Sequence, residues 1–368
     1  MATCFHNGLA RLDDPSRSGL NASSPERQPP AIVRLVFSFE DGVRIRGLET
    51  PLDPRLRADR AIVTHAHSDH VGRHRCWVTS PGTATLCARR WNARDLEVHE
   101  FNAPWREGEA TVTLLPAGHI LGSAMVLVEC GGTRVLYTGD FRLRPAAIAE
   151  PCEPVDADVL VMECTFGDPH YRFPDRGGVL DEVCTFIEET LALDQVPVLI
   201  AYSLGKAQEV ARAMSQRGYA VSLHPRAWAM LEAYRELGVR FENCTPCEMR
   251  PMRRGILIVP PGKSGSSLAR QFGKRRTAFL SGWALGPPAR RMGRWDAAFA
   301  LSDHADYDEL LEMVARVRPK RIYTLHGPDA FAARLRARGH DAWPAHDVAR
   351  GEAPAEYPPL EAQLQLFN

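Results

Sequence analysis

The sequence predicts an α/β protein in which an α/β lobe is inserted into a domain built mainly from strand hairpins. With 368 residues, the chain exceeds the roughly 250 to 300 residues at which a single core stops growing, so two lobes are expected. Short β-branched runs separated by Asp-Gly or Gly-Gly turns come first, and helices alternating with strands follow after about Gly167. Strand-like patterns return from about Ala289, which predicts that the first domain resumes there.

The predicted domain boundaries follow these changes of pattern. Residues 1–30 are rich in Ser, Pro, Asn and Arg without an apolar period, which is typical of a flexible leader. Residues 31–167 and 288–350 are predicted to be the two parts of the strand-rich domain, and residues 168–287 the inserted lobe. Residues 351–368 are predicted to be a linker followed by a terminal segment that binds a partner.

The bulk composition limits the classes of function and location. Lys plus Arg and Asp plus Glu each number 45, so no global field indicates a nucleic-acid partner, and any basic surface must be local. There is neither the apolar region of a signal peptide nor an apolar run of about 18 residues, so we expect a cytoplasmic protein without membrane contact. Nine scattered cysteines fit a reducing compartment as free thiols.

A dense group of metal-ligand residue types directly follows one apolar strand. The stretch THAHSDHVG places His65, His67, Asp69 and His70 within six positions, where one loop can turn all four toward a point. Imidazole and carboxylate groups together suit Zn²⁺, Mn²⁺ or Fe. The alternative is a solvated polar turn, but an ordinary surface loop does not need three histidines so close together.

Two further donors stand at the ends of other predicted strands. His119 lies in PAGHILGSA and Asp140 ends VLYTGD. Alone, each residue would more often be a buried polar group with ordinary hydrogen-bond partners. Because two metal ions share a bridging carboxylate well, the combined set predicts a dinuclear site.

The order of these motifs resembles a known superfamily. LDP with Asp53, THAHSDH, AGHILGS and YTGD are similar to the ordered motifs of the metallo-β-lactamase superfamily. Glu163 in MECTFGDPHY, His304 in ALSDHADY and His326 in YTLHG resemble the additional motifs of the β-CASP nucleases, and AYSLGKAQE and AFLSGWALG resemble their inserted lobe. The residues of these motifs are most similar to those of bacterial DNA ligase-associated exonucleases and mRNA 3′-end processing nuclease-like proteins. The resemblance implies an αββα sandwich with an inserted α/β β-CASP lobe and a substrate groove between them.

The resemblance also implies two divalent metal ions, Zn or alternatively Mn, and a role for each site residue. The implied ligands of the first ion are His65, His67, His119 and Asp140. Those of the second ion are Asp69, His70, Asp140 and His326. Asp53 would orient the histidine loop from behind, and His304 paired with Glu163 would be the general acid. Phosphodiester hydrolysis would then use a hydroxide held between the metal ions.

The choice between DNA and RNA depends on features outside this cluster. His326 favours RNA, because Artemis-like DNA-repair members of the family carry Val at this place, although the ligase-associated DNA group also carries His. The segment QLQLF resembles the motif by which bacterial repair proteins bind the DNA sliding clamp, with Gln363, Leu364, Leu366 and Phe367 as anchors. A final strand on the protein's own sheet is the alternative. A clamp partner favours a DNA exonuclease in repair, with a DNA ligase or helicase as a further candidate partner.

Three other functions compete with that prediction. An RNA-processing β-CASP ribonuclease would share the fold and the site. A small-molecule hydrolase of the glyoxalase or lactonase type would lack the inserted lobe and the His304 motif. A non-catalytic, clamp-bound scaffold would be expected to have lost metal ligands, whereas every expected ligand position is filled here.

Overall fold

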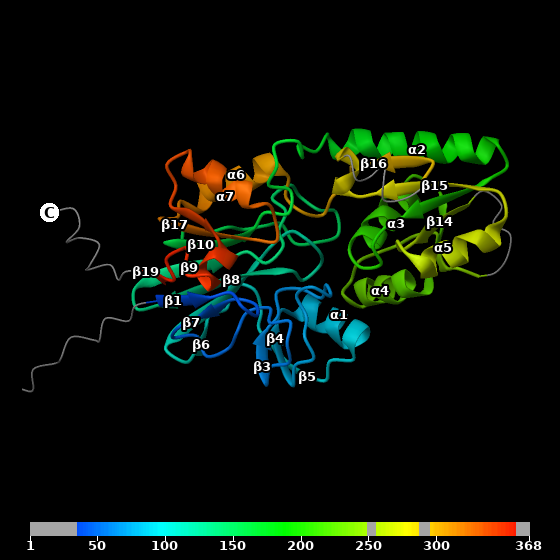
Figure 1. Ribbon diagram of the computed structural model, residues 1–368. Helices are drawn as coiled ribbons and strands as arrows, with labels where there is room; N and C mark the ends of the chain where they lie inside the picture. The colour runs from blue at the N-terminus through cyan, green and yellow to red at the C-terminus, as the bar shows by residue number, and fades with distance from the viewer. Residues whose placement is uncertain (1–34, 249–254, 287–294, 358–368) are drawn as a thin grey trace, which may run out of the picture. The chain divides into compact units, whose positions relative to one another are not determined.

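A computed structural model describes residues 35–248, 255–286 and 295–357 (Figure 1). The predicted leader and the predicted clamp-binding residues Gln363, Leu364, Leu366 and Phe367 lie outside the described residues. No helix among the described residues is long and apolar enough to cross a membrane.

A seven-stranded sheet forms the centre of the strand-rich domain. Its strands are β6 (Trp105–Glu107), β7 (Ala110–Pro116), β8 (Ala124–Cys130), β9 (Thr133–Tyr137), β10 (Val159–Glu163), β17 (Arg321–Leu325) and β18 (Ala342–Pro344). Strands β6 to β9 are antiparallel neighbours, whereas β9, β10, β17 and β18 run parallel. Gly131 and Gly132 form the two-residue turn between β8 and β9, at φ of 54° and 76°, which confirms the predicted Gly-Gly hairpin.

Six further strands build the second layer of this domain. They are β1 (Leu35–Ser38), β2 (Arg44–Ile45) and β19 (Glu356–Tyr357) in one sheet, and β3 (Arg60–Ile62), β4 (Cys76–Thr79) and β5 (Asp95–Val98) in another. Leu52 makes isolated bridges to both Val43 and Ile62, and so connects the two sheets. The helices of the domain are α1 (Pro81–Trp91), α6 (Tyr307–Val317), α7 (Asp329–Arg336) and α8 (Ala345–Ala349).

Alternating side chains explain why these elements stack in four layers. In β8, Val126 and Val128 face the core between the sheets, whereas Met125 and Leu127 face the core that contains α6 and α7. In β3, Ile62 likewise joins the core between the sheets, while its neighbour Ala61 packs in the cluster that contains α1. Both faces of the sheets are therefore buried, and the predicted αββα sandwich is confirmed.

The inserted lobe is a parallel α/β unit. Its strands are β11 (Val196–Ile200), β12 (Ala220–Leu223), β13 (Cys244–Pro246), β14 (Gly255–Val259), β15 (Arg275–Leu280) and β16 (Ala297–Phe299), and each pairing between them is parallel. Its helices are α2 (Arg176–Ala192), α3 (Lys206–Gln216), α4 (Pro225–Glu236) and α5 (Lys263–Ala269), with short 3₁₀ helices η1 (Arg270–Phe272) and η2 (Gly282–Leu285). Because β16 pairs with β15, this sheet continues to Phe299, past the predicted boundary at residue 287.

A buried group of charges connects the lobe to the strand-rich domain. Glu209 of α3 accepts from Arg142, which follows β9, at 3.0 Å, and forms an ion pair with Arg176 of α2 at 2.6 Å. Burial raises the pKa of the Glu209 carboxyl, but Arg142, Arg176 and Lys206 outweigh this effect and lower it from its usual value. Glu209 is therefore the ionised counter-charge for two guanidinium groups in a low-dielectric setting.

Replacing Glu209 should destabilise the protein much more than replacing an exposed glutamate. Glu209→Gln removes the carboxylate charge that pairs directly with two guanidinium groups and should lower the free energy of unfolding by about 3 kcal/mol. Glu232→Gln is the matched control, because Glu232 pairs with Arg235 at the surface of α4, and should cost less than about 1 kcal/mol. Urea unfolding followed by circular dichroism measures the free energy of unfolding of both variants. Equal losses would contradict the larger stabilisation assigned to the buried charge network.

Candidate metal centre

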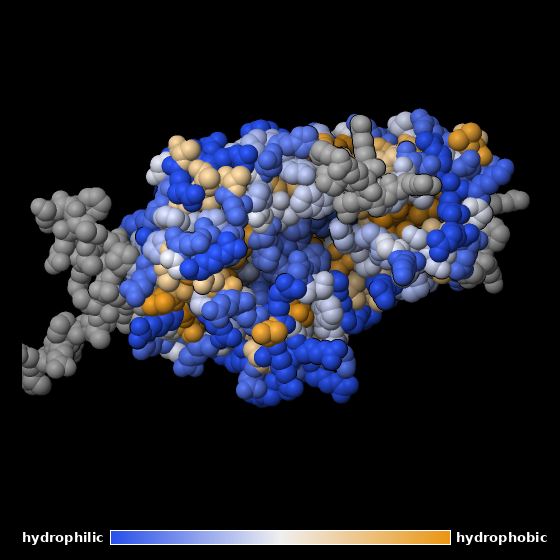
Figure 2. Space-filling view, viewed as in Figure 1, coloured by the Kyte–Doolittle hydropathy of each residue, from blue (hydrophilic) through white to orange (hydrophobic). Residues whose placement is uncertain are grey.

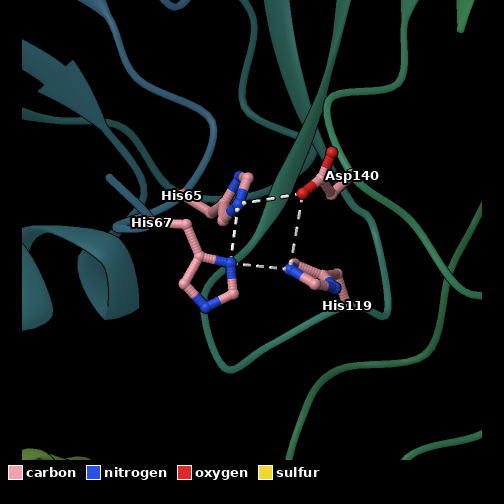
Figure 3. A group of neighbouring side chains, drawn as sticks. All are labelled: His65, His67, His119 and Asp140. Atoms are coloured by element: carbon pink, nitrogen blue, oxygen red, sulfur yellow. Dashed lines mark hydrogen bonds and ion pairs between the residues drawn. The ribbon is translucent and has the colours of Figure 1, made fainter. Parts of the chain in front are cut away.

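Loops that follow three strands bring four ligand-type side chains together (Figure 3). His65 and His67 follow β3, His119 follows β7, and Asp140 follows β9. His67 Nδ1 lies 3.2 Å from His65 Nε2 and 3.0 Å from His119 Nε2, and Asp140 Oδ2 lies 3.4 Å from His65 Nε2. One ligand atom of each residue lies within 4.8 Å of the others, so the structure places the predicted first ligand set around one point.

Hydrogen bonds behind the rings hold two of these imidazoles in fixed orientations. His119 Nδ1 donates to the Asp303 carbonyl at 2.8 Å, and His67 Nε2 donates to the Leu204 carbonyl at 3.2 Å. Because each ring uses its N–H outward, the other nitrogen presents a lone pair to the cluster. This arrangement is typical of metal-binding histidines.

A second group shares Asp140 with the first. Asp69, His70 and Asp140 also bring ligand atoms within 4.8 Å of one another, and His70 Nε2 lies 3.2 Å from Asp140 Oδ1. Asp69 is exposed to solvent, whereas His70 and Asp140 are buried. His326, the remaining predicted ligand, lies at the edge of this group with its ring centroid 5.1 Å from that of His70.

Asp53 supports His70 from the side away from the cluster. Its Oδ2 lies 2.8 Å from His70 Nδ1 and accepts from the Tyr137 hydroxyl at 2.9 Å, while its Oδ1 accepts from the Thr64 amide at 2.7 Å. The Asp53 backbone has a φ of 44°, an uncommon value for a residue with a Cβ. The structure therefore places Asp53 where the sequence prediction required an orienting carboxylate.

The electrostatics of the cluster suit a divalent metal ion. Burial lowers the pKa of His65 well below its ordinary value and lowers the pKa of His119 to about 4. Burial would raise the pKa of Asp140, but the charges of His70 and His304 hold it well below its usual range. Neutral imidazoles at His65 and His119 and an ionised Asp140 are the protonation states that metal ligands need. Burial lowers the pKa of His70, but Asp140 and Asp53 outweigh this effect and raise it well above its ordinary value, so a metal ion bound to His70 would displace its proton. His70 Nε2 is also buried without a hydrogen bond in the described parts of the chain, so these residues fit a metal ion.

Beside the cluster lies the predicted pair of Glu163 and His304. Glu163 ends β10, and both of its carboxylate oxygens lie 3.1 Å from His304 Nδ1. The same carboxylate accepts from the Phe141 amide at 2.9 Å and from the Thr165 hydroxyl at 2.6 Å. Burial lowers the pKa of His304, but Glu163 and Asp140 outweigh this effect and raise it to about 10.

A cavity of about 710 Å³ opens over both groups and is lined by residues of the strand-rich domain and of the inserted lobe. The strand-rich domain contributes His67, Asp69, Asp140, His304 and His326. The inserted lobe contributes residues that include Tyr202, Ser203, Lys206 and Trp283. Figure 2 shows a hollow near the middle of the viewed face, where hydrophilic residues predominate.

Sequence reasoning missed the charged residues that support this cavity. Lys206 is fully buried, and its Nζ lies 3.2 Å from Asp303 Oδ1. The Lys206 ammonium, together with the nearby histidines, holds the pKa of Asp303 far below its usual range despite burial. Asp303 directly precedes His304 in ALSDHADY, and Lys206 lies in AYSLGKAQE, so both were within quoted motifs. Their pairing could not be predicted without the fold, because they lie 97 positions apart in the sequence.

A family model and several known proteins are similar in sequence to the parts of this chain that carry the predicted site residues. Residues 297–346, which include His304 and His326, match the family model RMMBL, described as the Zn-dependent metallo-hydrolase RNA specificity domain. A protein named Probable DNA ligase from Opitutus terrae is 42% identical over 83% of this chain and 30% of its own length. The protein named 5′ exonuclease Apollo from Gallus gallus is 37% identical over 40% of this chain and 34% of its own. Endoribonuclease YSH1 from Candida albicans is 23% identical over 66% of this chain and 34% of its own.

The chain belongs to the β-CASP nuclease family of the metallo-β-lactamase superfamily. It spans about a third of the length of these curated relatives. In this β-CASP protein the strand-rich domain carries the predicted ligands, and residues of the inserted lobe line the same cavity. The predicted family and fold are confirmed.

Asp53 gives a test of the candidate metal centre in this β-CASP protein that leaves the predicted ligands in place. Asp53→Asn removes the charge behind His70 and replaces one acceptor oxygen with a donor, which disturbs the ring's tautomer. We expect metal affinity to fall roughly 10- to 100-fold. Asp41→Asn is the matched control, because Asp41 accepts from the Arg55 amide in an exposed turn. Chelator competition measures both variants, and equal affinities would contradict the role of Asp53.

Proposed function

We propose that this protein is a metal-dependent nuclease that hydrolyses phosphodiester bonds of DNA, acting as an exonuclease in repair. The observation that carries this proposal is the Glu163–His304 pair directly beside the histidine and carboxylate cluster, at one cavity. A small-molecule hydrolase would need neither this pair nor the large cavity wall that the inserted lobe supplies. The combination suits a polymeric phosphodiester whose leaving oxygen must be protonated.

The predicted ligands divide into two sets that share Asp140. His65, His67, His119 and Asp140 would hold one divalent ion, and Asp69, His70, Asp140 and His326 a second, with Zn favoured and Mn as the alternative. When bound, such ions supply Lewis acidity toward phosphate oxygens and lower the pKa of water. Asp140 lies between the two sets, so its carboxylate is the one group that both positions require.

His304 is proposed to protonate the departing oxygen. Glu163 contacts Nδ1, which fixes the tautomer and leaves Nε2 as the nitrogen that can face a substrate in the cavity. As a water oxygen forms a bond to phosphorus and releases a proton to solvent, the bond from phosphorus to the bridging 3′ oxygen breaks and the Nε2 proton passes to that leaving oxygen. His304 then takes up a proton from solvent, which restores the acid. The products would carry a 5′-phosphate and a 3′-hydroxyl, the two ends that a DNA ligase joins.

Two relatives support DNA as the substrate. A segment similar to 83% of this chain occurs in a protein named Probable DNA ligase, and another relative is named a 5′ exonuclease. Trimming of DNA ends before ligation would explain the first association, and a ligase is therefore a candidate partner. RNA is the second candidate substrate, because the matching family model is described as an RNA specificity domain and one relative is named an endoribonuclease.

A matched cleavage assay tests the substrate. The protein loaded with Zn²⁺ or Mn²⁺ should cut single-stranded DNA faster than RNA of the same sequence, and oligonucleotides labelled at either end report the polarity. Asp140→Ala is the negative control, because it removes the carboxylate shared by both ligand sets. Faster cleavage of RNA would assign the protein to RNA processing, and binding without cleavage of either polymer would favour a scaffold.

Separate measurements of metal content and cleavage test the assigned roles. His304→Ala should lower kcat roughly 10²- to 10⁴-fold with unchanged metal content, because its imidazole moves a proton and binds no metal in this proposal. His340→Ala, a change in the turn after α7, should leave both quantities unchanged. Metal loss in His304→Ala equal to that in Asp140→Ala would contradict the proposed division of labour.

The terminal segment QLQLF provides the proposed link to the DNA sliding clamp. Leu364, Leu366 and Phe367 would fill an apolar pocket on the clamp. Deletion of residues 363–368 should abolish clamp binding in a pull-down while cleavage of short oligonucleotides continues. Unchanged clamp binding after the deletion would overturn this interaction.

A further inference from the structure

A second cavity of about 440 Å³ adjoins the cavity of about 710 Å³ that is lined by His304 and the proposed metal ligands. Its lining comes from the loop after β10, from η2 and from the loop after β17, and comprises Thr165, Asp168, His170, Tyr171, Trp283 and Pro328. Thr165 and Trp283 line both cavities. Thr165, which lines this second cavity, donates its hydroxyl to Glu163 at 2.6 Å. The second cavity is therefore in direct contact with a hydrogen-bond partner of the proposed acid pair.

Aromatic rings form the walls of this second cavity. The rings of Tyr171 and Trp283 meet edge to face, with centroids 5.4 Å apart at 83°, and His170 lies against Tyr171 at 5.5 Å. Asp168 and the half-buried Thr165 add polar groups beside these rings. An aromatic slot with a few polar groups matches the chemistry of a nucleobase, which has a flat π face and a polar edge.

The slot is held rigidly and is coupled to the proposed acid. Phe166 lies behind it, with its ring centroid 4.8 Å from Trp283, 5.1 Å from Tyr171 and 6.1 Å from His304. Gly282, which precedes Trp283, packs so closely on this ring that a Cβ would come within 2.5 Å of Phe166 Cζ. The Phe166 ring therefore lies between Trp283 and His304 in a chain of ring contacts and links the position of the aromatic slot to that of the proposed acid.

We propose that this second cavity binds one unpaired nucleobase of the substrate, adjacent to the phosphodiester that is cleaved. The inference rests on the proposed nuclease function and deepens it, because it names the substrate as a strand with at least one unstacked nucleotide at the cleaved bond. A base inside a duplex is stacked and paired on its neighbours, so it must leave the helix to occupy the slot. Since every base has a π face, the slot should accept all four with similar affinity.

Abasic oligonucleotides test the slot directly. Single strands with one abasic residue, placed in turn at each position around the cleaved bond, are compared with the intact strand using metal-loaded protein. At one position beside that bond, loss of the base should lower kcat/KM on the order of 10- to 100-fold. Trp283→Ala should lower cleavage of the intact strand similarly, yet leave cleavage of that abasic strand unchanged, which also shows that the variant folds.

Three controls make the result decisive. Trp283→Phe keeps a ring and should keep most of the preference for the intact strand. Trp105→Ala removes a tryptophan of edge strand β6 that stacks on His99. This variant should leave the cleavage rate of both strands unchanged. Equal losses on intact and abasic strands in Trp283→Ala, or no loss on either, would overturn the base slot and leave the cavity to another occupant, such as a protein side chain.

A binding measurement separates failure of this inference from failure of the proposed function. Fluorescence anisotropy of the same labelled strands should show weaker binding of the intact strand to Trp283→Ala than to the unaltered protein, with equal binding of the abasic strand. If the unaltered protein binds the intact strand more tightly than the abasic strand but cleaves neither, the base-binding slot is supported and the nuclease proposal fails. If it cleaves both strands at the same rate, the nuclease proposal stands and the slot fails.

Discussion

The buried carboxylate of Asp140 is the charge on which the rest of the site depends. Its two oxygens lie near His65 and His70, and His304 Nδ1 is 3.9 Å from Oδ2. Burying an ionised carboxylate is costly unless cations or hydrogen-bond donors face it. The surrounding histidines meet this requirement, so the same charge that would destabilise an apolar core brings several loops together around one point.

A further set of buried charged groups, outside the ligand cluster, holds the loops that carry the proposed site residues in place. Arg142 follows Asp140 by two positions, donates to the Ser302 carbonyl at 3.0 Å and pairs with Glu209 of the inserted lobe. Ser302 and Asp303 precede His304, and the Asp303 carbonyl accepts from His119. The lobe therefore does more than line the cavity. Its Glu209 and Lys206 pair with Arg142 and Asp303, and so hold the segment that carries His304 and orients His119. Domain packing and site geometry are consequently parts of one network.

Much of this architecture could be predicted from the sequence because the signals are local. Three histidines within six residues, strand-ending His119 and Asp140, and the Gly131-Gly132 turn each leave a pattern that needs no knowledge of the fold. The lobe boundary was less visible, because β16 is a three-residue edge strand whose place is set by pairing with β15. The pairs of Lys206 with Asp303 and of Arg142 with Glu209 join distant segments, and no residue spacing encodes such contacts. Buried charge pairs are therefore the part of the site that the sequence shows least.

The placement of the two cavities has a consequence for substrate choice. In the proposed function, the metal ligands and His304 would act on a phosphodiester, and the aromatic slot would contact a base face; DNA and RNA share both groups. Discrimination between the polymers must therefore come from groups near the sugar, where a 2′-hydroxyl can donate and accept hydrogen bonds. Tyr202 and Ser203 of the inserted lobe line the same cavity as His326 and the other proposed metal ligands, and the Tyr202 side chain is 47% exposed. Under the proposed nuclease function, these lobe residues are therefore candidates, beside His326, for the contacts that distinguish DNA from RNA.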